Sequence, residues 1–419
     1  MSPHTHPDAT ETGHWLLSAP GLTLTARGGD RLPVHDGPGQ FRRLAASAES
    51  ALRASPAGAV IVGAVPFDES IPAHLVLTRL ERHPHRPARR SDLVRSLQDP
   101  DLQLPSVAPH TADAPRSQPP PLPEPPPAAY LAAVRDILAE IDAGTVSKVV
   151  LARSLRIPLD GSYDHRHLVP ALTAALGRKE PAGHLFSVSL PPPHPGATPP
   201  VLIGATPETL LRRTGDLLTL NPLAGTIARH PNPAVDRARA AALLRSGKDR
   251  AEHQHVIDAL RHRLRPCCRT LDIPAEPRLH ATSRLWHLST PIRARLRHPA
   301  PSALALATAL HPTPAVCGTP APGAADLIRA LEPIPRRYFS GLVGWMDQQG
   351  DGHWVIALRC GELDPSGLRV FAGAGIVTGS SPESELAETE TKLATMLGAI
   401  EEARSGLPQP VATPGGHPS

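Results

Sequence analysis

Apolar and polar residues alternate along much of this chain in runs of strand length, separated by turn residues. The run 59–67 is almost continuously apolar and predicts a buried strand that ends near Pro66. The stretch 201–220 predicts a hairpin that turns near Gly215, and 341–377 predicts a meander. Shorter strand patterns occupy 14–18, 22–26 and 148–153.

Helical periodicity appears between these groups of strands. Apolar residues recur every three or four positions over 130–141, and Gly144 stands where a C-terminal cap belongs. Two more helical patterns cover 234–246 and 249–264, and a last helix is expected to begin near Ser381. Strand, helix and strand do not alternate regularly. The pattern therefore predicts an α+β fold of antiparallel sheets flanked by helices, and not a doubly wound parallel sheet.

Proline changes this picture locally, because 52 of the 419 residues are proline. The segment 105–127 is the richest part, and 119–127 is expected to be extended and polyproline-like. Such a segment can be a domain linker, a ligand for an SH3-type domain or a surface crossing within one domain. The composition alone leaves these three interpretations open.

The charge balance and the cysteines exclude several classes of protein. A net charge of +4, with only 3% aromatic residues, does not indicate nucleic-acid binding, which needs clustered basic residues and stacking aromatics. The four cysteines form no C-x-x-C pair, which favours a reduced, cytoplasmic protein. The N-terminus lacks the apolar core of a signal peptide, and no run of 18 apolar residues predicts a membrane span.

A glycine-rich turn over 373–381 opens onto the last predicted helix. Its G-x-G-x-x-x-G spacing, with no Lys-Ser/Thr after it, does not match a dinucleotide or P-loop motif. Backbone amides at a helix N-terminus also bind carboxylates, so we expect an anionic ligand near this turn. On the helix, Glu385 and Glu388 share a face, and Lys392 follows four residues after Glu388.

Carboxylates on separate helices raise the possibility of a metal site. Glu252 lies on the predicted helix 249–264, far in sequence from Glu385 and Glu388. Each taken alone fits a surface Glu–Lys pair, but together they are the hard oxygen ligands that Mg²⁺ prefers. A zinc site at His253 and His255 is disfavoured, because two residues of spacing on a helix directs the two rings apart.

Two ionisable residues interrupt apolar strands. Lys148 begins the strand pattern 148–153, where burial would favour the neutral amine that a general base requires. A solvent-exposed lysine at a strand end is the structural alternative. Glu208 interrupts the predicted hairpin 201–220 in the same way.

These motifs together resemble the chorismate-utilising enzymes, which include isochorismate synthases, salicylate synthases and the synthase subunits of anthranilate and aminodeoxychorismate synthase. The resemblance is strong over 130–400, and the signatures occur in the family's order. They are SKVVLAR at 147–153, ATPE at 205–208, NPLAGT at 221–226, KDRAEH at 248–253, LHPTPAVCG at 310–318, FAGAGIV at 371–377 and ETETK at 388–392.

The resemblance implies a fold, a substrate and roles for individual residues. It implies one chorismate-binding catalytic domain, an α/β sandwich over 13–404, with disordered tails at 1–12 and 405–419. It implies Lys148 as the base that activates water and Glu208 as the general acid. By the same resemblance, Mg²⁺ is the cofactor, with Glu252 and Glu388 as its ligands and Glu385 nearby, and the positions that contact substrate are Ala315, Arg359, Gly373 and Lys392.

Two positions separate the family's members. At position 148 the lysine resembles the residue of isochorismate and salicylate synthases, whereas ammonia-using members often have glutamine at that position. Ala224 stands where aminodeoxychorismate synthases commonly have a nucleophilic lysine. The segment 310–318 resembles isochorismate synthases more than salicylate synthases. We therefore expect an isochorismate synthase, with siderophore supply preferred over the menaquinone pathway, and no amidotransferase subunit.

Other outcomes remain open at this stage. A salicylate synthase would also eliminate pyruvate, and an inactive chorismate-binding paralogue would use the chain for binding only. The proline-rich loop 191–200 departs from the family pattern and is expected at the surface. We further expect a monomer that binds neither nucleic acid nor membrane.

Overall fold

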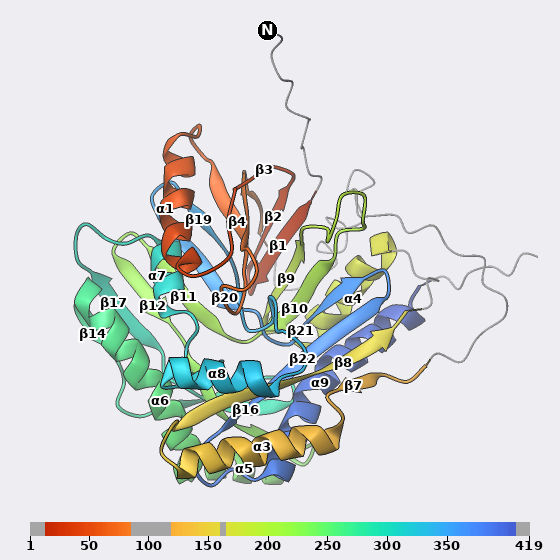
Figure 1. The fold of residues 1–419 in the computed structure, drawn as a ribbon. Coiled ribbons are helices and arrows are strands. Elements are labelled where there is room, and N and C mark those ends of the chain that lie inside the picture. The colour runs from red at the N-terminus through yellow and green to blue at the C-terminus, as the bar shows by residue number, and fades with distance from the viewer. Residues whose placement is uncertain (1–12, 85–118, 160–164, 408–419) are drawn as a thin grey trace, which may run out of the picture.

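The computed structural model describes residues 13–84, 119–159 and 165–407. Two large antiparallel sheets pack face to face, and helices cover the outer side of each (Figure 1). The predicted α+β class, with antiparallel sheets flanked by helices, is confirmed. The predicted disordered tails lie outside the described residues, apart from 405–407, and so does 105–118 of the proline-rich segment.

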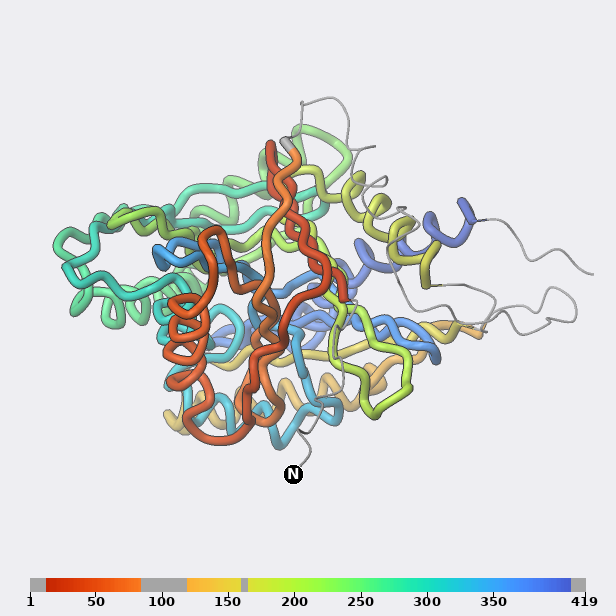
Figure 2. The backbone as a smooth tube through the Cα atoms, turned by 90° about the horizontal axis from the view of Figure 1, so that it is seen from above, coloured from red at the N-terminus to blue at the C-terminus, as the bar shows by residue number. Residues whose placement is uncertain are grey.

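The larger sheet contains ten of the strands in the described ranges. In order, these are β18 (Gly318–Thr319), β8 (Lys148–Pro158), β22 (Gly367–Ile376), β21 (Cys360–Asp364), β10 (Val201–Thr206), β9 (His184–Ser189), β1 (His14–Ala19), β2 (Leu22–Arg27) and β6 (Glu81–Pro84), with β7 (Leu122–Glu124) beside β8. Strand β8 pairs with the whole of β22. The N-terminal strand β1 pairs with β9, which brings the red and yellow-green parts of the chain together (Figure 2).

The second large sheet has nine described strands, and a small sheet of three lies beside it. The larger of the two runs β14 (Cys268–Asp272), β17 (Ile292–Leu296), β12 (Leu217–Leu220), β11 (Thr209–Thr214), β20 (Gly352–Ile356), β19 (Leu342–Asp347), β4 (Val60–Val65), β5 (His74–Thr78) and β3 (Asp30–Arg31). The small sheet runs β13 (Leu223–Ala228), β16 (Leu285–Ser289) and β15 (Arg278–Ala281).

Four of the helices in the described residues, α5, α6, α7 and α9, begin at a capping side chain. Ser246 and Ser381, for example, accept hydrogen bonds from backbone amides at the starts of α6 and α9. The elements are α1 (Gln40–Arg53), α3 (Pro127–Asp142), α4 (His165–Lys179), α5 (Pro233–Arg245), α6 (Gly247–Leu264), the 3-10 turn η1 (Arg265–Cys267), α7 (Ala303–Leu310), α8 (Ala321–Leu331) and α9 (Pro382–Ser405).

Apolar side chains form a core in each layer of the sandwich. Between the two sheets, Trp15 and Val188 from one sheet pack in the same cluster as Val62 and Val355 from the other. Helices α4 and α9 bury their apolar faces on the outside of the ten-stranded sheet, and α1, α6 and α7 do so on the nine-stranded sheet. The continuous apolar run of β4 reflects its position, because a strand covered on both faces has no polar side.

Two strand patterns predicted as continuous units are divided between the sheets. The expected hairpin over 201–220 does turn at Gly215, but only β11 and β12 form it, and β10 belongs to the other sheet. The expected meander over 341–377 is likewise two hairpins, β19–β20 and β21–β22, in different sheets. Period-two patterning specifies a strand but not its sheet, so these crossings were not visible in the sequence.

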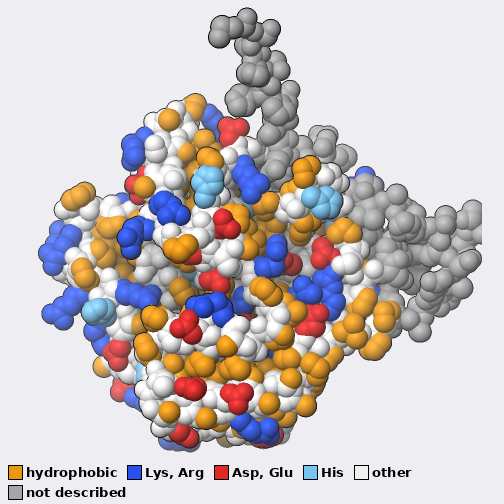
Figure 3. All heavy atoms as spheres, in the orientation of Figure 1, with side chains coloured by type: hydrophobic (Ala, Val, Ile, Leu, Met, Phe, Trp, Pro, Cys, Tyr) orange, Lys and Arg blue, Asp and Glu red, His pale blue; other side chains and the backbone are white. Residues whose placement is uncertain are grey.

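The surface shows no single-sign charge over the face in Figure 3, where basic and acidic side chains are interspersed. Within the described part of the chain, no helix is both long and apolar enough to cross a lipid bilayer. The loop 191–200 is exposed or half-buried, as expected. Of the proline-rich segment, the described end includes β7, whose residues pair with β8.

Candidate active site

A cavity lies where the chain crosses between the two large sheets. One crossing joins β10 to β11 through Pro207 and Glu208, and the other joins β20 to β21 through Arg359. The crossings are bonded to each other: the Ile356 amide donates to the Glu208 carbonyl at 3.1 Å, and the Ala205 amide donates to the Arg359 carbonyl at 3.1 Å. Glu208 and Arg359 are therefore held side by side by backbone structure.

Seven of the nine residues predicted for the site line this cavity. They are Glu208, Glu252, Ala315, Arg359, Gly373, Glu388 and Lys392. Lys148 and Glu385 do not line it: Lys148 forms an ion pair with the lining residue Glu252, and Glu385 forms one with Lys248. The structure thus brings together residues that are up to 244 positions apart in the sequence, from Lys148 to Lys392.

Lys148 is fully buried, with 0% of its surface exposed, so the exposed strand-end alternative is wrong. Its amine lies 3.1 Å from Glu252 Oε1, and among the described residues it has no acceptor in good hydrogen-bond geometry. Gly375 on β22 makes room for this pair, because a Cβ there would overlap the Glu252 carboxylate. Burial of Glu252 opposes its ionisation, but Lys148 and neighbouring lysines outweigh burial and hold the pKa of Glu252 below its ordinary value.

Glu208 has the opposite electrostatic setting. Only 3% of its surface is exposed, and burial raises the pKa of Glu208 to about 7. The Leu223 amide donates to its Oε1 at 3.3 Å, and this bond together with Lys148, Arg359 and Lys392 limits the rise. A carboxyl group with a pKa near neutrality can donate a proton at physiological pH.

Helix α9 supplies two more carboxylates, each held by a lysine. The Lys392 amine donates to Glu388 Oε1 at 2.6 Å and to the Gly373 carbonyl at 2.7 Å. The Lys248 amine donates to Glu385 Oε1 at 2.6 Å. Burial and the nearby Glu388 carboxylate raise the pKa of Glu385, although Lys248 opposes them.

Comparisons with known proteins show which family this chain is similar to. Residues 75–401 match the family model described as chorismate binding enzyme. The isochorismate synthase DhbC of Bacillus subtilis strain 168 is 39% identical over 399 residues, which cover 93% of this chain and 94% of that protein.

The chain belongs to the chorismate-binding enzyme family. A crystal structure of a proposed 2,3-dihydroxybenzoate-specific isochorismate synthase, DhbC from Bacillus anthracis, superposes with a TM-score of 0.80 at 33% identity, covering 94% of this chain and 98% of that one. The menaquinone-specific isochorismate synthase MenF of Escherichia coli superposes with a TM-score of 0.71 at 23% identity over 94% and 90% of the two chains, which supports the fold alone.

Isochorismate synthases generally depend on magnesium, and the carboxylates of this chorismate-binding enzyme fit a hard divalent cation. Glu252 on α6 and Glu388 on α9 both line the cavity. In the described residues, no three potential ligands already form a metal site. Each carboxylate is paired with a lysine through its Oε1 atom.

Sequence patterns missed one residue that contacts Arg359 on the cavity wall. His287 on β16 lines the cavity, its Nδ1 lies 3.0 Å from Thr226 Oγ1, and its Nε2 lies 3.5 Å from Arg359 Nη2. Burial, with Arg359 and Lys392, holds the pKa of His287 well below its ordinary value, so the ring is neutral. A histidine within an alternating strand gives no spacing signal, and only the fold brings it to Arg359.

Arg359 itself adopts an unusual backbone conformation. Its φ of 48° lies in the left-handed region, which side chains other than glycine adopt at a cost of about 1–3 kcal/mol. The side chain is buried at the cavity, where its guanidinium can bind a carboxylate through two parallel hydrogen bonds. In this backbone conformation the positively charged guanidinium of Arg359 lies at the cavity.

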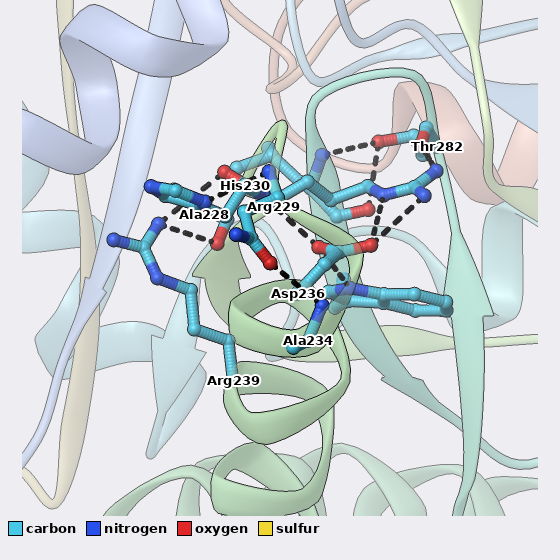
Figure 4. Close-up of polar contacts among 10 residues, drawn as sticks. Ala228, Arg229, His230, Ala234, Asp236, Arg239 and Thr282 are labelled. Carbon is cyan, nitrogen blue, oxygen red and sulfur yellow. Dashed lines mark hydrogen bonds and ion pairs between the residues drawn. The ribbon is translucent and has the colours of Figure 1, made fainter.

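A polar network fixes the strands that carry part of this wall (Figure 4). On α5, Asp236 accepts hydrogen bonds from Arg229 at 3.0 Å, from the Trp286 indole at 2.9 Å and from the His230 amide at 3.0 Å. Arg239 donates to the Ala228 carbonyl at 3.0 Å. The network ties α5 to β13 and β16, which carry cavity-lining residues on the same small sheet.

Proposed function

We propose that this enzyme is an isochorismate synthase that converts chorismate to isochorismate by adding water at ring C2 and expelling the C4 hydroxyl. One observation carries the proposal. At the same cavity stand a buried lysine, whose amine contacts a carboxylate, and a buried glutamate with a pKa of about 7. Opposed acid and base groups are what this exchange of hydroxyls requires.

In this mechanism Lys148 and Glu208 move the protons. Lys148 removes a proton from water as the water oxygen bonds to C2 of the ring. The two ring double bonds each shift by one position, and the C4–O bond breaks. Protonated Glu208 donates its proton to the leaving hydroxyl, which departs as water. The two groups must then exchange protons with solvent before the next turnover.

The substrate is a dicarboxylate, and the cavity offers it positive charge. Arg359 is placed to bind one carboxylate, and Lys392, Ala315 and Gly373 are placed along the rest of the cavity. Glu252 and Glu388 would hold Mg²⁺, with Glu385 behind them. When bound, Mg²⁺ would supply charge that fixes a substrate carboxylate and draws electron density from the ring.

The name of one relative supports our choice of pathway. DhbC of Bacillus anthracis is named for 2,3-dihydroxybenzoate, so we favour supply of a catechol siderophore over the menaquinone pathway. A monomer without an amidotransferase subunit and a cytoplasmic location remain predictions. The four cysteines are all free, in agreement with that location.

Isotope labelling tests the proposed reaction. In water enriched in ¹⁸O, chorismate and Mg²⁺ should yield isochorismate with one ¹⁸O at the C2 hydroxyl, because the incoming oxygen comes from solvent. Mass spectrometry of the product measures this. Unlabelled isochorismate would exclude water addition by Lys148, and no isochorismate at all would overturn the proposed function.

A further inference from the structure

Strand β8 has a gap along the edge that faces away from β22. At its start, Lys148 and Val149 pair with β18, and from Ser154 onward it pairs with β7. Between these two strands, none of the described strands pairs with 150–153 on this side. Backbone groups in a buried gap of this kind need other partners, because an unpaired buried amide or carbonyl is destabilising.

A side-chain ion pair fills the gap. Arg336 Nη2 donates to the Val150 carbonyl at 2.6 Å, and Glu332 Oε1 accepts from the Ala152 amide at 2.7 Å. The two side chains also bond to each other, Arg336 Nε to Glu332 Oε2 at 2.8 Å and Nη2 to Oε1 at 2.5 Å. The pair therefore makes the contacts to β8 that a neighbouring strand would make.

The same arginine reaches a second segment that lines the cavity. Arg336 Nη1 donates to the Val316 carbonyl at 2.6 Å. Val150 and Val316 both line the cavity, as does Ala315 beside Val316. One planar guanidinium thus spans from β8, two residues after Lys148, to the 311–317 loop that carries Ala315. The Val150 amide also donates to the Cys317 carbonyl at 2.8 Å, so this backbone bond and the rigid guanidinium together set the separation of β8 and the loop.

Burial of this pair indicates a role that requires directed hydrogen bonds. The side chains of Arg336 and Glu332 are only 2% and 5% exposed. Removing two charges from water is costly, and an apolar pair often stabilises a core equally well. An apolar pair would, however, leave the Val150 and Val316 carbonyls and the Ala152 amide without partners.

We propose that Arg336 and Glu332 are positioning residues for the reaction, which hold Lys148 and Ala315 at their working separation by bridging β8 and the 311–317 loop. This inference rests on the proposed function for its kinetic test. Arg336 and Glu332 themselves do not contact substrate. Their effect passes through the backbone at Val150 and Val316.

The test is Arg336→Lys, with Arg156→Lys as the matched control. Lysine keeps the charge but lacks the fork that serves both carbonyls and Glu332. Arg156 lies on β8, the strand that Arg336 contacts. Its guanidinium donates to Asp364 at 2.8 Å, and it does not line the cavity. We expect kcat/KM for chorismate to fall about 100-fold in Arg336→Lys, the scale expected for a misplacement of about 1 Å, and less than threefold in Arg156→Lys.

Glu332→Gln keeps an amide oxygen that can accept from the Ala152 amide, but it places an NH₂ group against Arg336 Nε and so loses part of the pair. Its kcat/KM should fall less than that of Arg336→Lys and more than that of Arg156→Lys. Melting temperatures of all three variants are measured to show that each is folded at the assay temperature. Equal losses of activity in Arg336→Lys and Arg156→Lys, or no loss in Arg336→Lys, would overturn the positioning role.

Hydrogen exchange separates this proposal from the proposed function. In folded Arg336→Lys, exchange at the amides of Val150 and Ala152 should become faster than in Arg156→Lys, whatever product the wild-type enzyme makes. Unchanged exchange would contradict the bridge. Failure of the wild-type enzyme to form isochorismate would overturn the proposed function. Faster exchange in Arg336→Lys would still support the bridge between β8 and the 311–317 loop.

Discussion

At the scale of single residues, burial determines which groups at the cavity can exchange protons. Lys148 is enclosed with Glu252, and Glu208 is enclosed with few hydrogen-bond donors. Burial raises the pKa of Glu208 to about 7, so the protonated state of Glu208 is accessible at neutral pH. Glu208 can therefore act as an acid, and the amine of Lys148, held beside Glu252, is the proposed base.

Replacing Lys148 tests the base. Lys148→Ala should lower kcat by about 10²–10⁴-fold, the contribution of general base catalysis, while substrate binding largely survives. Stopped assays of isochorismate and a binding titration with chorismate measure the two effects. Lys179→Ala on α4 is the control, since that lysine pairs with Glu402 outside the cavity. More than a tenth of wild-type kcat in Lys148→Ala would remove it as the base.

The acid makes a prediction about pH. Glu208 must be protonated to donate, and its pKa in the free enzyme is raised to about 7. The protonated fraction is therefore high below pH 7 and falls above it, so kcat/KM should have a descending limb near pH 7. Rates measured from pH 5.5 to 9 show the limb. Glu208→Gln should lose it, with at least about a 100-fold lower rate.

A profile without a descending limb in the wild-type enzyme would contradict this role for Glu208.

The motifs, together with the resemblance to the chorismate-utilising enzymes, predicted nine site positions. The fold brings seven of them to one cavity, while Lys148 pairs with one of the seven, Glu252, and Glu385 pairs with Lys248. Their roles remain predictions. His287 and the Arg336–Glu332 pair were missed, because their partners are backbone groups or side chains distant in sequence.

At the scale of elements, helices α6 and α9 approach the cavity from separate parts of the chain. Glu252 on α6 and Glu388 on α9 line it together, although 136 positions separate them in the sequence. The helix patterns predicted each helix, and the shared face of Glu385 and Glu388 was visible from their spacing. The approach of one helix to the other depends on how the sheets between them pack.

The carboxylates make a prediction about magnesium. Glu252→Gln and Glu388→Gln should each raise the Mg²⁺ concentration for half-maximal activity at least about tenfold, because each variant loses one charged oxygen ligand. Both proteins should remain folded. Activity titrated against Mg²⁺ measures the shift, and Glu402→Gln is the control on α9, because Glu402 pairs with Arg178 and Lys179 instead.

An unchanged half-saturation point in both variants would remove these residues from the metal site.

Strands illustrate the limit of sequence patterns more clearly than helices do. The alternation over 201–220 and 341–377 marked the strands and their turns, but Glu208 and Arg359 lie where these stretches change sheets. These two predicted site residues therefore lie at positions where a purely local interpretation of the strands fails.

At the scale of the whole molecule, two sheets that exchange strands form one site from most of the chain. The N-terminal strands β1 and β4 lie in different sheets, and each pairs with strands from the second half of the fold or its middle. The α+β class followed from the order of patterns, because local patterns report element type. The pairing order of the sheets did not, because it depends on contacts between distant residues.

The product formed from chorismate tests the central claim most directly. In the proposed mechanism Lys148 is the base for water, and Ala224 offers no amine for an enzyme-bound adduct. With chorismate and Mg²⁺, the wild-type enzyme should release isochorismate with little salicylate and no pyruvate. Chromatography of the products and a lactate dehydrogenase assay for pyruvate measure this. Stoichiometric pyruvate with salicylate would identify a salicylate synthase instead, and an aminated product with ammonium would contradict the role of Lys148.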